Sequence, residues 1–125
     1  MKKKILIVDD AKLWASHIWG KLEELGIDYQ WVLNGAYAVK RVARNIKYDA
    51  IIMDMKMPVM NGREATRKLR KMGYTKPIIG HTSLYHLEED NELAENSGVD
   101  TYLPKSIDLD PLVEVLRRFK LLDNQ

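Results

Sequence analysis

Five short strand-like segments alternate with helical segments along this chain, and that alternation constrains the possible folds more than any other feature. The first segment, Ile5 to Val8, is a continuous apolar run, which is typical of a strand buried on both faces. Further strands are expected from Tyr29 to Leu33, Ala50 to Met53, Pro77 to Gly80 and Thr101 to Leu103.

Helical segments are expected over residues 12–25, 36–46, 63–72, 87–96 and 111–120. The first of them ends at Gly26, a typical C-cap residue, and the last is preceded by Asp108 and Asp110 as expected caps. The apolar face of the first helix is expected to consist of Leu13, Trp14, Ile18, Leu22 and Leu25. Strands that alternate with helices form a parallel sheet covered on both faces, so the sequence predicts one α/β domain over residues 1–125.

Composition and charge exclude several classes of function. Cysteine is absent, which excludes disulfides, thiolate metal sites and cysteine nucleophiles. The net charge of +2 is too balanced to indicate nucleic-acid binding, and the apolar runs are too short to cross a bilayer. The start of the chain does not have the pattern of a signal peptide. We therefore expect a cytoplasmic protein that binds neither nucleic acid nor a membrane.

Residues with complementary chemistry stand at four of the five strand ends. Asp9 and Asp10 follow the first strand, Asp54 the third, Thr82 the fourth and Lys105 the fifth. Ligands of such sheets bind beyond the carboxyl ends of the strands, so these side chains are expected to converge. Three carboxylates that lie together need a counter-charge, and Mg²⁺ is a suitable one because it prefers oxygen ligands. A hydroxyl and an ammonium beside them suggest a phosphoryl group.

Each of these residues taken alone also has an ordinary structural interpretation. Asp10 could cap the first helix, Thr82 could be a cap, and Lys105 could be a solvated charge. Their occurrence together, at strand ends that share one edge of a sheet, favours a functional site.

Two segments then resemble the response-regulator receiver domains of two-component signalling. The opening Ile5-Leu-Ile-Val-Asp-Asp10 resembles the start of that family, and Asp54-Met-Lys-Met-Pro-Val-Met-Asn-Gly62 resembles its phosphoacceptor segment. Thr82 and Tyr102-Leu-Pro-Lys105 follow in the family's order. The resemblance implies an α/β, doubly wound, five-stranded parallel sheet of the flavodoxin-like (βα)5 type, with strand order 2-1-3-4-5.

The resemblance also implies roles for individual residues. Asp54 would accept a phosphoryl group from a phosphohistidine, and Lys105 and Thr82 would contact the phosphoryl oxygens. Asp10 and Asp54 would bind Mg²⁺ directly, Asp9 mostly through water. The Mg²⁺ ligands implied by the resemblance are Asp9, Asp10, Asp54 and the backbone carbonyl of Lys56. Thr82 and Tyr102 would form a two-state switch, in which the tyrosine turns inward as the hydroxyl moves.

Two positions depart from the family pattern. Ser106 follows Lys105 where the family usually has proline, and we predict a trans Lys105–Ser106 bond because a cis bond before a non-proline residue costs about 2.5–4 kcal/mol. His81 precedes Thr82 where small or apolar residues are commoner, and it is expected to be a packed histidine.

These roles describe a signalling switch that is not an enzyme beyond its own phosphorylation and dephosphorylation. Its partners would be a histidine kinase or phosphotransfer protein and a downstream protein target, which would bind the face formed by residues 86–120. The chain would be a monomer or a phosphorylation-linked dimer.

Other functions fit less well. The chain could be a receiver module excised from a hybrid histidine kinase or a larger response regulator. A phosphatase of the haloacid-dehalogenase type would need a second acid two residues after its nucleophile, and Lys56 stands there. A flavodoxin-like cofactor binder would need a phosphate loop after the first strand, where Asp9 and Asp10 would repel a phosphate.

Overall fold

A parallel sheet runs through the middle of the molecule, and its strands follow the predicted order. The computed structural model describes residues 2–57, 59–83 and 98–123. The strands are β1 (Lys4–Val8), β2 (Asp28–Val32), β3 (Ala50–Asp54), β4 (Ile78–Thr82) and β5 (Thr101–Pro104), and they lie in the order β2-β1-β3-β4-β5. All four neighbouring pairs are parallel, which confirms the predicted fold class.

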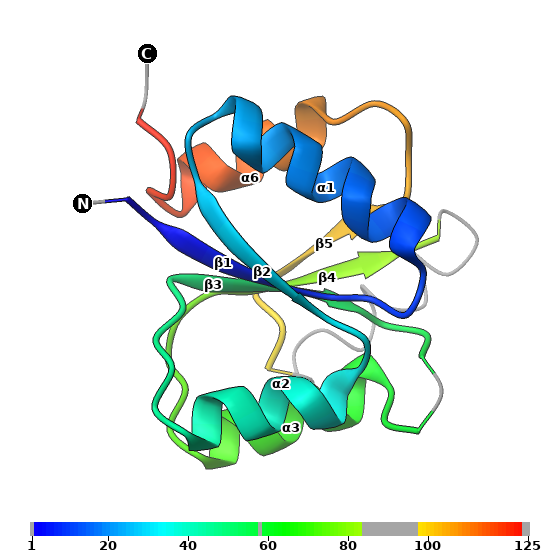
Figure 1. The fold of residues 1–125 in the computed structure, drawn as a ribbon, viewed down its shortest axis with the longest axis vertical. Coiled ribbons are helices and arrows are strands. Elements are labelled where there is room, and N and C mark those ends of the chain that lie inside the picture. The colour runs from blue at the N-terminus through cyan, green and yellow to red at the C-terminus, as the bar shows by residue number, and fades with distance from the viewer. Residues whose placement is uncertain (1, 58, 84–97, 124–125) are drawn as a thin grey trace.

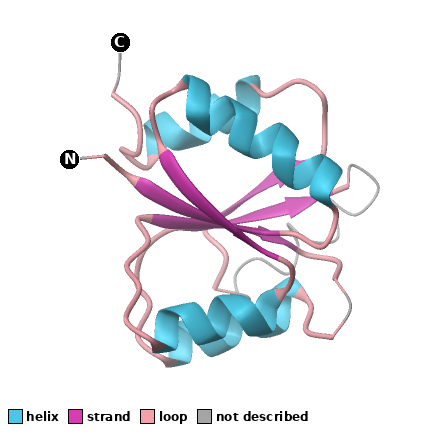
Figure 2. Ribbon diagram, in the orientation of Figure 1, coloured by secondary structure: helices cyan, strands magenta, loops and turns pink. Residues whose placement is uncertain are grey.

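Helices cover both faces of this sheet (Figure 1). Helices α1 (Lys12–Glu24) and α6 (Asp110–Arg118) lie on one face, and α2 (Gly35–Ala43) and α3 (Gly62–Lys71) lie on the other. Figure 2 shows the resulting three layers of helix, strand and helix. The helix expected over residues 87–96 falls outside the described part of the chain.

Two apolar cores follow from the period-2 alternation of the strands. In β1, Leu6 and Val8 face α2 and α3, whereas Ile5 and Ile7 face α1 and α6. All four are buried, as the continuous apolar run predicted. Because both faces of the central strands are covered, these strands are rigid platforms for whatever stands at their carboxyl ends.

The helices agree only in part with the details expected from the sequence. Gly26 has φ +75° just beyond α1, which confirms its position at the helix end, because glycine adopts this left-handed conformation readily. Leu13 was expected on the buried face of α1 but is 78% exposed, so that assignment is wrong. The N-cap of α6 is Leu109, whose side chain makes no capping hydrogen bond. The side chain of Asp108 accepts a hydrogen bond from the main-chain N–H of Asp110, the first residue of α6.

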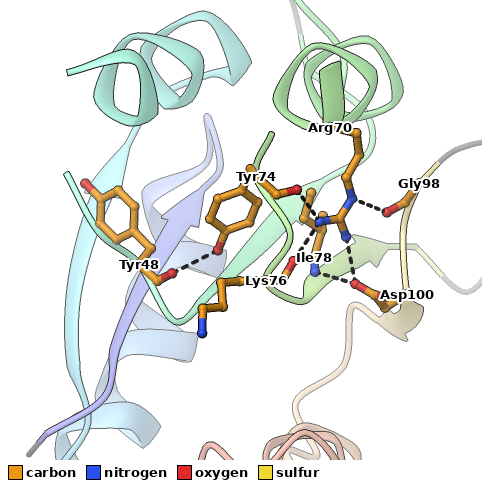
Figure 3. Close-up of polar contacts among 7 residues, drawn as sticks. All are labelled: Tyr48, Arg70, Tyr74, Lys76, Ile78, Gly98 and Asp100. Atoms are coloured by element: carbon orange, nitrogen blue, oxygen red, sulfur yellow. Dashed lines mark hydrogen bonds and ion pairs between the residues drawn. The ribbon is translucent and has the colours of Figure 1, made fainter. Parts of the chain in front are cut away.

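The amino-terminal end of β4 is tied to the neighbouring loops by Arg70 (Figure 3). Its guanidinium donates to the carbonyls of Gly98, Tyr74 and Lys76 at 2.8–3.0 Å and pairs with Asp100 at 2.9 Å. Asp100 also accepts the main-chain N–H of Ile78 at 2.8 Å. The loop that leads into β5 is thereby fixed to the end of α3.

No helix in the described ranges is both long enough and apolar enough to cross a membrane.

Candidate functional site

The carboxyl edge of the sheet brings together side chains that are far apart in the sequence. Asp9 and Asp10 stand just after β1, and Asp54 is the last residue of β3. One carboxylate oxygen from each of these three residues lies within 4.8 Å of the others. On the neighbouring strands, Thr82 is the last residue of β4 and Lys105 directly follows β5. The convergence expected from the strand ends is therefore present.

Asp54 lies at the centre of this group and is only 1% exposed. Its Oδ1 accepts hydrogen bonds from the main-chain N–H of Lys56 and from the ammonium of Lys105, both at 3.1 Å. Its Oδ2 is buried and has no hydrogen-bond partner among the described residues. A buried carboxylate oxygen without a donor is costly, so this atom is suited to an added cation or covalent group.

Neighbouring groups shift the pKa of Asp54 in opposite directions. Burial raises the pKa of Asp54 from 3.8 to about 7, and the negative charge of Asp9 adds to this increase. The ammonium of Lys105 and the N–H of Lys56 act in the opposite direction. Further positive charge at this edge would therefore favour the ionised carboxylate.

Asp9 is held firmly, whereas Asp10 is exposed. Asp9 is 2% exposed, its Oδ1 accepts the N–H of Ala11 at 2.9 Å, and its Oδ2 lies 3.9 Å from Nδ1 of His81. The N-cap of α1 is Ala11, and no side chain caps this helix. Asp10 is thus not the helix cap that one interpretation of the sequence allowed, and its carboxylate is available for a ligand.

The donor set fits a hard divalent cation. Three carboxylates converge, one oxygen of Asp54 is buried without a donor among the described residues, and Asp10, one of the three acids, is exposed. Mg²⁺ takes oxygen ligands and retains several waters, so such a partly open set suits it. Lys56 is exposed, and its main-chain N–H contacts Asp54.

The remaining predicted residues stand on β4 and on β5 with its following loop. Thr82 is buried, and its carbonyl accepts the N–H of Lys105 at 2.6 Å. Tyr102 is also buried and lies directly beside Gly80. No peptide bond between described residues is cis, so the Lys105–Ser106 bond is trans as predicted, and Lys105 nevertheless reaches Asp54.

Sequence analysis missed the part that two aromatic residues play at this edge. Trp14 was expected to pack in a helix face, but its ring also lies 6.0 Å from the ammonium of Lys105 and 6.0 Å from the ring of His81. Trp31 donates a hydrogen bond from its indole to the carbonyl of Asp9 at 2.8 Å. His81 is buried, which confirms that it is a packed histidine. No local pattern reveals such contacts; only the nearness of Trp14 to Asp10 in the sequence hinted at one of them.

Comparisons with known proteins agree with this geometry. Residues 5–117 match the family described as response regulator receiver domain. Two-component response regulator 24 from Arabidopsis thaliana is 35% identical over 117 residues, which cover 94% of this chain and 84% of the relative. Hybrid signal transduction histidine kinase G from Dictyostelium discoideum is 42% identical over 122 residues, which cover 93% of this chain but only 4% of the kinase.

One solved structure of similar fold contains a metal ion. It is the receiver domain of the sensor histidine kinase PA1611 from Pseudomonas aeruginosa, with a magnesium ion coordinated in its active-site cleft. The two chains are 34% identical, with a TM-score of 0.83 and coverage of 95% of this chain and 98% of the other.

Proposed function

Since the chain belongs to the response regulator receiver domain family, whose members act in phosphorelay signalling, we propose that Asp54 is its phosphoacceptor. The observation that carries this proposal is the state of the Asp54 carboxylate. One of its oxygens is bound by Lys105, and the other is buried without a donor among the described residues. The carboxylates of Asp9 and Asp10 lie close to that of Asp54. The Lys105 ammonium favours the ionised carboxylate, which is the nucleophilic form.

In the proposed reaction an oxygen of Asp54 attacks the phosphorus of a phosphohistidine. The new O–P bond makes an acyl phosphate, the P–N bond breaks, and the donor imidazole takes up a proton. Lys105 pairs with one phosphoryl oxygen and the Thr82 hydroxyl donates to another. Asp9, Asp10, Asp54 and the carbonyl of Lys56 would hold Mg²⁺, which when bound supplies further neutralisation of the phosphoryl charge.

Exposed apolar residues around the site suit a protein phosphodonor. Leu13 stands in the first turn of α1, Val59 in the loop after β3 and Ile107 in the loop after β5, and they are 78%, 86% and 86% exposed. All three segments lie at the carboxyl edge of the sheet, around Asp54. A rim of this kind supports docking by a histidine kinase or a phosphotransfer protein.

The output of the switch is proposed to be a protein contact. Thr82 and Tyr102 would transmit the effect of phosphorylation to the face formed by residues 86–120. The described ranges include β5 and α6 of this face. The residues of the expected 87–96 helix lie outside them. A phosphatase of the haloacid-dehalogenase type is not favoured, because Lys56 occupies the position of the second acid. The match covers only 4% of the hybrid histidine kinase, which agrees with the alternative that this receiver is a module of a larger protein.

Phosphorylation by a small-molecule donor tests the assignment of Asp54. The chain is incubated with acetyl phosphate, with and without Mg²⁺, and its intact mass is measured. We expect one phosphoryl group in the presence of Mg²⁺ for the unmodified chain and for the exposed-site control Asp123→Asn, and none for Asp54→Asn. Equal labelling of Asp54→Asn would refute the assignment.

A second experiment addresses the docking rim. In Leu13→Gln and Ile107→Gln, we expect slower transfer from a phosphorylated histidine kinase and unchanged labelling by acetyl phosphate. An equal loss with both donors would contradict docking, because a small molecule does not need the rim.

A further inference from the structure

The main chain of Asp9 is bound at both of its polar groups by the edge strand β2. Its N–H donates to the carbonyl of Val32 at 3.1 Å, which continues the parallel pairing of β1 and β2. Its carbonyl accepts the indole N–H of Trp31 at 2.8 Å. The second bond is not part of the sheet and depends on one side chain.

The carbonyl of Asp9 and the amide of Asp10 belong to the same peptide plane. Because that plane is rigid, a hydrogen bond to the carbonyl also fixes the direction in which the chain enters Asp10. Asp10 needs such a restraint more than Asp9 does. The carboxylate of Asp9 is buried and accepts the N–H of Ala11, whereas Asp10 is exposed and its carboxylate has no hydrogen-bond or ion-pair partner within the described ranges.

Trp31 is itself held in place by an aromatic stack between β2 and α1. The ring of Trp19 lies 5.4 Å from Trp31 and stacks on Tyr29 at 5.6 Å with an angle of 9°. The hydroxyl of Tyr29 donates to Glu23 at 2.6 Å, near the end of the same helix. The indole therefore presents its N–H from a packed position.

We propose that Trp31 is a positioning residue for the Mg²⁺ ligand Asp10. Its indole N–H fixes the Asp9–Asp10 peptide so that the Asp10 carboxylate points toward Asp54 before the cation binds. This inference rests on the proposed function, since it requires that Mg²⁺ binds at Asp9, Asp10 and Asp54. Trp31 would act through this peptide and would not itself be a ligand of the cation.

The test compares Trp31→Phe with the matched control Trp19→Phe. Both substitutions remove an indole from the same stack, but only the first removes the hydrogen bond to Asp9. Mg²⁺ affinity is measured from the amide shifts of Ala11 and Lys56 in a titration, and stability from urea unfolding without Mg²⁺. We expect about three- to tenfold weaker Mg²⁺ binding for Trp31→Phe, as the loss of one hydrogen bond predicts. Trp19→Phe keeps an aromatic ring in the stack and leaves the Trp31 hydrogen bond in place, so it should lose stability and keep its Mg²⁺ affinity.

A second measurement separates positioning from packing. The heteronuclear NOE of the Asp10 amide, without Mg²⁺, should fall in Trp31→Phe and not in Trp19→Phe. If Trp31→Phe proves poorly folded, benzothienylalanine at position 31 keeps the bicyclic ring and removes only the N–H, and the same loss of affinity is expected.

Unchanged Mg²⁺ affinity in the Trp31 variants, or an equal loss in Trp19→Phe, would overturn this inference alone. Failure of the unmodified chain to bind Mg²⁺ would overturn the proposed function and this inference with it.

Discussion

Gly80 in β4 lies against the proposed switch residue Tyr102, and a methyl group added there tests the packing of that ring. A Cβ on Gly80 would lie 2.5 Å and 2.6 Å from two ring carbons of Tyr102 and 3.2 Å from the sulfur of Met55. The sulfur belongs to a flexible side chain, which can yield, whereas the ring has to leave its place as a unit. The ring of Tyr102 thus occupies the space that a side chain at position 80 would need.

The cost of Gly80→Ala follows from two opposing effects. Overpacking a core site costs about 1–3 kcal/mol. Replacing glycine in an extended conformation recovers about 0.4–1 kcal/mol, because the unfolded chain loses conformational freedom. The net destabilisation should therefore be about 1–2 kcal/mol, which for a domain of this size lowers Tm by about 4–8 °C.

Urea unfolding of a double-mutant cycle isolates the contact between the two residues. In the Tyr102→Ala background the ring is gone, so Gly80→Ala should become neutral or stabilising by up to about 1 kcal/mol. The same substitution at Gly20, on the exposed side of α1, meets no atom within 4 Å and should stabilise by about 1 kcal/mol.

The decisive result is the dependence of the effect on Tyr102. If Gly80→Ala destabilises the protein equally with and without the tyrosine ring, the steric reasoning is wrong and β4 is being disturbed in another way.

Three further predictions concern stability and the lifetime of the phosphorylated state. Burial raises the pKa of Asp54 to about 7 in the folded state, against 3.8 in the unfolded chain. Between these two pH values the folded state binds more protons than the unfolded state, so the protein loses stability as the pH rises from about 4 to 7. At pH 7.5, Asp54→Asn should therefore unfold at a higher urea concentration than the unmodified chain, with a free energy of unfolding larger by about 1–3 kcal/mol. At pH 3.5 the two free energies of unfolding should be equal, and a pH-independent difference would contradict this reasoning. Arg70→Lys should cost about 1–3 kcal/mol in urea unfolding, because an ammonium cannot reach all the acceptors of the guanidinium, and unchanged stability would show that the network in Figure 3 contributes little. Lys56 cannot accept a proton from water, so we expect slow decay of the phosphorylated chain and faster decay in Lys56→Glu, measured as loss of label after removal of the donor; decay within seconds in the unmodified chain would refute this.

Much of the site could be predicted because chemistry at strand ends is encoded locally. A continuous apolar run ends where a polar residue begins, so Asp9 and Asp54 mark the ends of β1 and β3 in the sequence itself. Parallel strands joined by helices place those ends at one edge, because the crossover connection returns each strand to the same starting side. These two facts predict that the carboxylates meet at one edge of the sheet, whereas the roles of the individual residues are implied by the family resemblance.

Helix orientation was less predictable than helix position. The 3.6-residue period placed both Leu13 and Trp14 near the apolar face of α1, but residues one position apart point about 100° apart around the helix axis. The crossing of α1 over the sheet then decided that Trp14 lies against Lys105 and His81 while Leu13 points into solvent. The end of β4 also depends on tertiary pairing. This strand extends to Thr82 because Thr82 pairs with Pro104 of β5.

By itself, the sequence determined the order of the elements, the two-sided burial of the central strands and the residues that stand at the strand ends. Only the tertiary structure decided that Asp54 Oδ2 is buried without a donor among the described residues, that burial raises the pKa of Asp54, and that the indole of Trp31 donates to the carbonyl of Asp9. The physical reason is separation along the chain. Periodicity and turn chemistry describe neighbours within a few residues, whereas burial and long-range hydrogen bonds depend on segments tens of residues apart that meet only after packing.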